Sequence, residues 1–131
     1  MKEQSKKVIL VIEDELPLLE AIVAKGDRAG FEMISARSIA EGKRFLKDVE
    51  HVDAVWIDHF LPGGLGLELV QAMRAHPDWK SIPVFLVTNA IEPDIINKYL
   101  KAGIQQYYTK VMSSLDDIFA SIHASFEQVK K

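Results

Sequence analysis

Three short apolar runs, rich in β-branched residues, constrain the fold of this 131-residue chain more than any other feature. They lie at Val8–Ile12, Ala54–Ile57 and Val84–Val87. Runs of this length without polar alternation are typical of strands buried on both faces, as in a parallel sheet. Consecutive parallel strands need a long crossover connection between them, which is usually a helix. The runs therefore predict a parallel sheet that is covered by helices on both faces.

Weaker strand patterns and five helical patterns complete the chain. The weaker strands are expected at Phe31–Ser35 and Ile104–Thr109. The helical segments are bounded by ordinary start and stop signals, which include a Ser-x-x-Glu capping box, prolines at or near helix ends, and glycines that follow them. They are expected at about Leu16–Ala29, from Ser38 onward, at Leu67–Ala75, from Pro93 to Gly103, and from Leu115 to Val129.

Five β/α units in strict alternation predict an α/β fold with right-handed crossovers. We expect a flavodoxin-like, doubly wound sheet of five parallel strands in the order 2-1-3-4-5. The whole chain, 1–131, is expected to form one domain, with an ordered core at about 6–129. In such sheets ligands bind outside the carboxyl ends of strands 1 and 3, where the winding direction reverses.

Composition excludes several classes of protein. A membrane helix needs about 18 or more consecutive apolar residues, and the chain has no such run. The short apolar run after the basic N-terminus ends at Glu13 and does not resemble a signal peptide. With no cysteine, disulfides are excluded, so a cytoplasmic location is expected. A net charge of −3 argues against a nucleic-acid surface, and neither nucleic acid nor membrane is expected as a partner.

Chemically active residues follow the predicted strands. Strand 1 ends in Glu13-Asp14, strand 3 in Asp58, strand 4 in Thr88 and strand 5 in Lys110. Strands 1 and 3 are neighbours in the expected order, so their three carboxylates should converge and repel one another unless a cation lies among them. An all-oxygen cluster favours a hard ion such as Mg²⁺. Carboxylates, Mg²⁺, an ammonium and a hydroxyl together indicate a phosphoryl-transfer site.

These residues, in this order, resemble the receiver domain of two-component response regulators over essentially the whole chain. The resemblance is carried by the acidic pair after Val-Ile-Leu-Val-Ile, by Asp58 between Val55-Trp56-Ile57 and His59-Phe60-Leu61-Pro62-Gly63-Gly64, and by Thr88, Tyr107 and Lys110. The sequence departs from the family in having Val111 where proline usually follows the lysine. Asn89 likewise stands where a small residue is common.

The resemblance implies a function for each position. Asp58 would accept a phosphoryl group from a histidine kinase or phosphotransfer protein. Glu13, Asp14, Asp58 and the backbone carbonyl of Phe60 would hold Mg²⁺, for which Mn²⁺ can substitute. Lys110 and Thr88 would contact the phosphoryl group. Thr88 and Tyr107 would then switch the face formed by the fourth helix, fifth strand and fifth helix, to which a downstream partner binds.

Other interpretations remain open from the residues themselves. Asp14 could cap the first helix, and Tyr107 could serve packing alone. A phosphatase with an aspartate nucleophile would typically carry a second acid at the position of Phe60. An electron-transfer flavoprotein would need a phosphate loop where the acidic Glu13-Asp14 pair stands. A degenerate receiver that binds partners without phosphorylation is the main alternative.

The remaining expectations concern output and the other polar residues. The protein is expected to be a stoichiometric phosphoacceptor rather than an enzyme. No residues remain for an output domain, so it would act by binding a partner or would be a fragment of a longer protein. The four histidines show no metal-ligand spacing and are interpreted as solvated or structural; they are His51, His59, His76 and His123.

Overall fold

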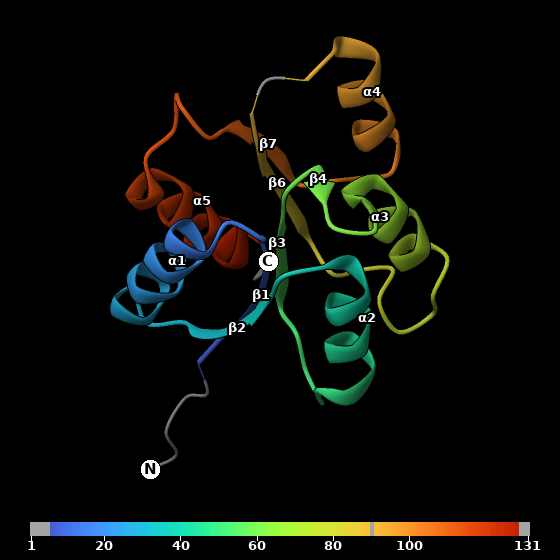
Figure 1. Ribbon diagram of the computed structural model, residues 1–131. Helices are drawn as coiled ribbons and strands as arrows, with labels where there is room; N and C mark the ends of the chain where they lie inside the picture. Colours follow the sequence, from blue (N-terminus) through green and yellow to red (C-terminus); the bar gives the residue numbers. More distant parts are fainter. Residues whose placement is uncertain (1–5, 90, 129–131) are drawn as a thin grey trace.

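The computed structural model describes residues 6–89 and 91–128 and contains the expected five-stranded parallel sheet (Figure 1). The order of strands is β2-β1-β3-β6-β7, which corresponds to 2-1-3-4-5 in the expected numbering. This order confirms the predicted fold class. The strands are β1 (Val8–Ile12), β2 (Glu32–Ala36), β3 (Ala54–Ile57), β6 (Val84–Thr88) and β7 (Gln106–Thr109).

Helices cover both faces of the sheet, as the buried runs require. In Figure 1, α1 and α5 lie on one side of the sheet and α2, α3 and α4 on the other. Their bounds are α1 (Leu16–Arg28), α2 (Ile39–Asp48), α3 (Gly66–Arg74), α4 (Pro93–Lys101) and α5 (Leu115–Gln128). The expected extension of the last helix to Val129 lies outside the described residues.

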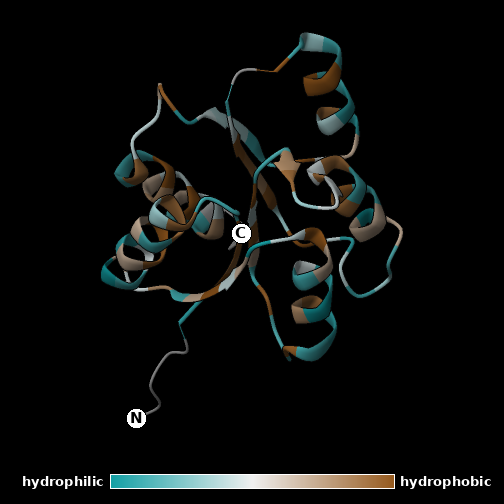
Figure 2. Ribbon diagram, viewed as in Figure 1, coloured by the Kyte–Doolittle hydropathy of each residue, from teal (hydrophilic) through white to brown (hydrophobic). Residues whose placement is uncertain are grey.

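The central strands divide the core into two layers, because successive side chains of a strand point to opposite faces. In β3, Val55 and Ile57 pack under α2 and α3, whereas Ala54 and Trp56 pack under α1 and α5. Figure 2 shows brown, hydrophobic residues along these strands and on the sheet-facing sides of the helices. Trp56 belongs to the core, as expected, with its ring 5.1 Å from that of Phe119.

Local signals place the helix ends close to their expected positions. Ser38 caps α2, and its hydroxyl accepts a hydrogen bond from the Glu41 backbone N–H. Gly103 follows α4 with a φ of 80°, a conformation that favours glycine. The weaker strands are shifted from the prediction: β2 begins at Glu32 rather than Phe31, and β7 begins at Gln106 rather than Ile104.

A small hairpin after β3 was not predicted. Its strands β4 (Phe60–Leu61) and β5 (Gly64–Leu65) pair antiparallel and lead directly into α3. Gly63, with a φ of 84°, permits the turn between them. The hairpin fixes the segment that leaves the carboxyl end of β3, the edge at which the site was expected.

Candidate phosphoacceptor site

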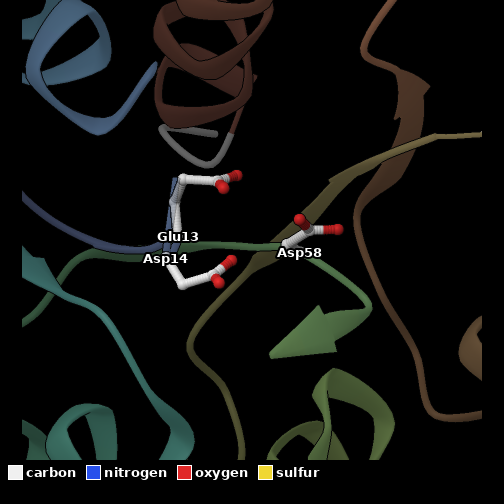
Figure 3. A group of neighbouring side chains, drawn as sticks. All are labelled: Glu13, Asp14 and Asp58. Atoms are coloured by element: carbon white, nitrogen blue, oxygen red, sulfur yellow. The ribbon is translucent and has the colours of Figure 1, made fainter. Parts of the chain in front are cut away.

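The sheet itself brings the acidic residues together. Ile12 at the end of β1 is in register with Ile57 at the end of β3, so the residues that follow them emerge side by side. The Asp58 backbone N–H donates to the Ile12 carbonyl, with N···O 3.3 Å. Figure 3 shows the Glu13 and Asp14 carboxylates directed toward the side on which Asp58 lies.

The three carboxylates form a compact, largely buried cluster. Each of Glu13, Asp14 and Asp58 offers an oxygen that lies within 4.8 Å of the others. Glu13 is 1% exposed and Asp58 6% exposed, whereas Asp14 is half-buried at the rim. Charged carboxylates are rarely buried unless they are paired or bound to a cation. The cluster therefore needs positive charge at this point.

Lys110 supplies part of that charge from the end of β7. Its Nζ lies 2.8 Å from Asp58 Oδ2 and 3.0 Å from Glu13 Oε1, and its side chain is 16% exposed. Burial alone would lower the pKa of Lys110, but hydrogen bonds and attraction to Asp58 and Glu13 outweigh burial and raise it above its ordinary value. The ammonium is thus fixed in its charged form beside the predicted acceptor.

Glu13 is the most deeply buried member of the cluster. Burial raises the pKa of its carboxyl above the ordinary value, while the hydrogen bond from the Glu15 backbone N–H and the nearby Lys110 ammonium oppose the increase. Oε2 accepts from the Glu15 N–H at 3.0 Å. Oε1, by contrast, is buried and, despite the nearby ammonium, accepts no hydrogen bond of good geometry from the described chain. This oxygen can accept one more partner.

Thr88 and Tyr107 lie on the neighbouring strands β6 and β7. Thr88 ends β6 and is buried, and its carbonyl accepts a hydrogen bond from the Lys110 backbone N–H at 2.9 Å. Tyr107 is half-buried on β7, in register with Leu86, and packs against the core layer that contains α4. The switching roles of both residues stay predictions.

The departures from the family pattern lie on the surface. The Lys110–Val111 peptide is trans, and Val111 is 83% exposed. Asn89 is also exposed. Phe60, two residues after Asp58, begins β4 and is 63% exposed. Because Val111 and Asn89 are both exposed, neither of these two departures introduces a bulky side chain into the buried part of the acidic cluster.

Two contacts around the site were missed by sequence reasoning. Arg37 donates through Nη2 to the Asp14 carbonyl at 3.0 Å, which places a guanidinium near the rim. His59, interpreted from sequence as solvated or structural, is buried, and its Nδ1 lies 2.6 Å from the hydroxyl of Tyr99 on α4. Burial lowers the pKa of His59 and raises that of Tyr99.

The cluster fits a hard divalent cation. Its donors are all oxygens, they lie close together, and the buried Glu13 Oε1 has an unused acceptor capacity. Mg²⁺ typically takes one or two carboxylates and keeps several waters, a requirement that a half-buried Asp14 at an open rim can meet. The donor set is therefore suited to Mg²⁺ or Mn²⁺ and unsuited to metals that prefer sulfur ligands.

The fold and the site together define an α/β protein of the doubly wound class, with a buried acidic cluster and a lysine at the carboxyl ends of its strands. Residues 9–123 match the family model described as the response regulator receiver domain. The chain belongs to this family.

Known proteins agree with the assignment. The phosphate regulon transcriptional regulatory protein PhoB of Pseudomonas aeruginosa is 30% identical over 107 residues, which cover 82% of this chain and 46% of that protein. A CheY-like response regulator receiver domain protein from Methanospirillum hungatei has the same fold, with a TM-score of 0.86, 22% identity and coverage of 95% and 96% of the two chains. A receiver domain from Clostridium thermocellum gives a TM-score of 0.83 at 25% identity, with coverage of 95% and 97%.

The chain spans about half the length of the PhoB proteins it matches, with 46% and 52% of two of them covered. The similarity therefore concerns only about half of each of these PhoB proteins. Among the helices in the described part of the chain, none has the length and apolar character that a membrane crossing requires.

Proposed function

We propose that this receiver domain is a stoichiometric phosphoacceptor and that Asp58 takes a phosphoryl group from a phosphohistidine of a histidine kinase or phosphotransfer protein. The observation that carries the proposal is the Asp58 carboxylate, which is buried at the end of β3 and held at 2.8 Å by Lys110 beside two further carboxylates. Burying several charged groups together carries a large desolvation cost, and such clusters are concentrated at functional sites.

In the proposed reaction one Asp58 oxygen attacks phosphorus, a P–O bond forms, and the P–N bond to the donor histidine breaks. Lys110 neutralises negative charge on the phosphoryl oxygens, which lie next to the oxygen it already contacts. Glu13, Asp14, Asp58 and the Phe60 carbonyl are the proposed ligands of Mg²⁺, which when bound neutralises charge on the same oxygens. The buried Thr88 hydroxyl is the proposed hydrogen-bond donor to the product.

The proposed output is a change at the face formed by α4, β7 and α5, to which a partner protein binds. Tyr107 is the proposed switch residue, since it is half-buried on β7, a strand of this face, three residues before Lys110. PhoB is named as a transcriptional regulatory protein, but the match covers only 46% of its length, so it does not determine the output of the present chain. The cytoplasmic location expected from the sequence stays a prediction.

Mass spectrometry tests the acceptor directly. After incubation of the purified chain with acetyl phosphate and Mg²⁺, we expect a mass gain of about 80 Da for one phosphoryl group. Asp58→Asn should abolish this gain, whereas Asp78→Asn, at an exposed position far from the cluster, should retain it. A mass gain of equal yield in Asp58→Asn would refute the assignment. A parent that is never modified would instead favour a phosphorylation-independent binding module.

A further inference from the structure

Helix α4 contributes only one fully buried side chain to the core of the domain. Among the residues of α4, only Tyr99 is buried, with 0% exposure. The helix lies at the outer end of its layer, next to α3 (Figure 1). Partly buried isoleucines add apolar contact around it. The position of α4 therefore depends heavily on what surrounds the Tyr99 ring and hydroxyl.

The Tyr99 hydroxyl reaches the segment that follows the predicted acceptor. It lies 2.6 Å from His59 Nδ1, and the two rings meet edge to face with centroids 5.4 Å apart. Gly66 makes this approach possible, because a Cβ at that position would come within 3.0 Å of the hydroxyl and 2.3 Å of the Asp58 carbonyl. The hydroxyl thus lies directly beside the backbone that carries Asp58.

His59 continues the connection to the Asp58 carboxylate. Its backbone N–H donates to Asp58 Oδ1 at 2.7 Å, and its carbonyl accepts from the Gly66 N–H at 2.7 Å. A single residue therefore contacts the acceptor carboxylate through its backbone and α4 through its ring. Both contacts are buried, so neither partner can readily exchange them for water.

Phosphorylation must alter the first of these contacts. A carboxylate accepts a charge-assisted hydrogen bond, which is roughly twice as strong as a neutral one. When one Asp58 oxygen becomes bonded to phosphorus, the group becomes an acyl phosphate, and the remaining oxygen becomes a neutral, weaker acceptor. The His59 N–H must then keep a weaker bond or move toward the phosphoryl oxygens. Either outcome changes the forces on the peptide that orients the His59 ring.

We infer that His59 and Tyr99 form a mechanical link between the acceptor and α4, through which the state of Asp58 sets the position of that helix. The inference rests on the proposed phosphorylation of Asp58. The link is separate from the predicted Thr88–Tyr107 switch, because it shares no side chain with it and runs through the hairpin segment rather than through β6 and β7. His59 and Tyr99 are positioning residues, and neither side chain is needed for the attack on phosphorus.

Hydrogen exchange of α4 before and after phosphorylation tests the link. The chain is modified with acetyl phosphate and Mg²⁺, the yield is read from intact mass, and exchange is followed in peptides that cover 93–101. In the parent we expect phosphorylation to change α4 exchange by about fivefold, the factor expected for one altered hydrogen bond. Tyr99→Phe should still gain the phosphoryl mass but lose this response.

Two further variants make the test specific. The double variant His59→Leu with Tyr99→Phe replaces both side chains of the His59–Tyr99 contact by apolar ones, so neither side chain keeps an unpaired polar group, and it should fold even if a single variant does not. It too should be modified without an α4 response. Tyr108→Phe is the matched control, since its buried hydroxyl has no hydrogen-bond partner within the described chain, and it should respond like the parent.

The outcomes separate the link from the proposed function. If the parent shows no mass gain, the phosphoacceptor proposal fails and the link fails with it. If the parent is modified but its α4 exchange is unchanged, the link alone is wrong. If Tyr99→Phe and the double variant are modified and keep a response of parental size, the link is likewise wrong, whereas the phosphoacceptor proposal stands.

Discussion

Replacing Lys110 by methionine should destabilise the metal-free domain strongly. The Lys110 ammonium lies 2.8 Å from Asp58 Oδ2 and 3.0 Å from Glu13 Oε1, and both carboxylate side chains are almost fully buried. Removal of one partner from a buried ion pair costs about 3–5 kcal/mol, because it leaves an uncompensated charge. For a chain of this length that loss corresponds to a decrease in Tm on the order of 10–20 °C.

The matched control is Lys25→Met. Lys25 makes an ion pair of the same length, 2.8 Å, with Asp116, but the two side chains are 38% and 75% exposed. An exposed pair contributes about 0–1 kcal/mol, so the control should lower Tm by less than about 4 °C. Melting by circular dichroism in EDTA at pH 7.5 compares the three proteins. If Lys110→Met melts within about 2 °C of Lys25→Met, the buried ion pair contributes no more to the free energy of unfolding than the exposed pair does, and the reasoning is wrong.

The loss in Lys110→Met should also depend on pH and on Mg²⁺. Burial raises the folded-state pKa of Glu13, so its contribution favours folding at low pH and is lost as the pH rises through that pKa. The deficit of the variant relative to the parent should therefore be smaller at pH 5 than at pH 7.5. Mg²⁺ in excess should stabilise the variant by about 2.7 kcal/mol at 100 times its Kd, since it replaces the lost charge.

Three further predictions concern single side chains. Millimolar Mg²⁺ should raise the Tm of the parent by mass action but not that of Asp14→Ala, and equal shifts in both would contradict a role of Asp14 in metal binding. Phe60 has no group that can orient a water, so the Asp58 phosphate should decay slowly, and Phe60→Asn should accelerate the decay measured by mass. A parent that decays as fast as Phe60→Asn would show that this side chain does not set the lifetime of the phosphorylated form. Burial raises the pKa of Tyr99 in the folded state. The contribution of the neutral Tyr99 hydroxyl to stability is therefore complete below the unfolded-state pKa of 10.0 and is lost as the pH rises above that value. The unfolding free energy of the parent should fall relative to that of Tyr99→Phe by up to about 1.4 kcal/mol per pH unit above pH 10. Urea denaturation of both proteins from pH 9 to 11 measures this difference, and a difference that does not change with pH would contradict the prediction.

The sheet and the acidic cluster were accessible from sequence because both depend on local patterns. Fully apolar runs predicted β1, β3 and β6, and the residues just after them had to meet once the strand order was known. The strand β2 was placed less accurately, since its exposed and half-buried residues give a weaker signal than a continuous apolar run.

The hairpin and the His59–Tyr99 contact were not accessible in this way. Strands of two residues, such as β4 and β5, carry no measurable periodicity. His59 and Tyr99 are 40 positions apart, and their pairing depends on the packing of α4 against the loop after β3. A lone histidine and a tyrosine in an amphipathic helix each have an ordinary structural explanation, so only the fold shows that they meet.

The sparse burial of α4 has a consequence for how such a domain diversifies. Because Tyr99 is the only buried residue of the helix, its other positions are largely free of the demands of core packing. Substitutions at exposed positions usually change stability by no more than about 0.5 kcal/mol. The outer surface of α4 can therefore accumulate changes in shape and charge through mutation and selection while Tyr99 keeps the helix in place. A duplicated copy of the gene could acquire a new partner at this helix before any residue of the acidic cluster had changed.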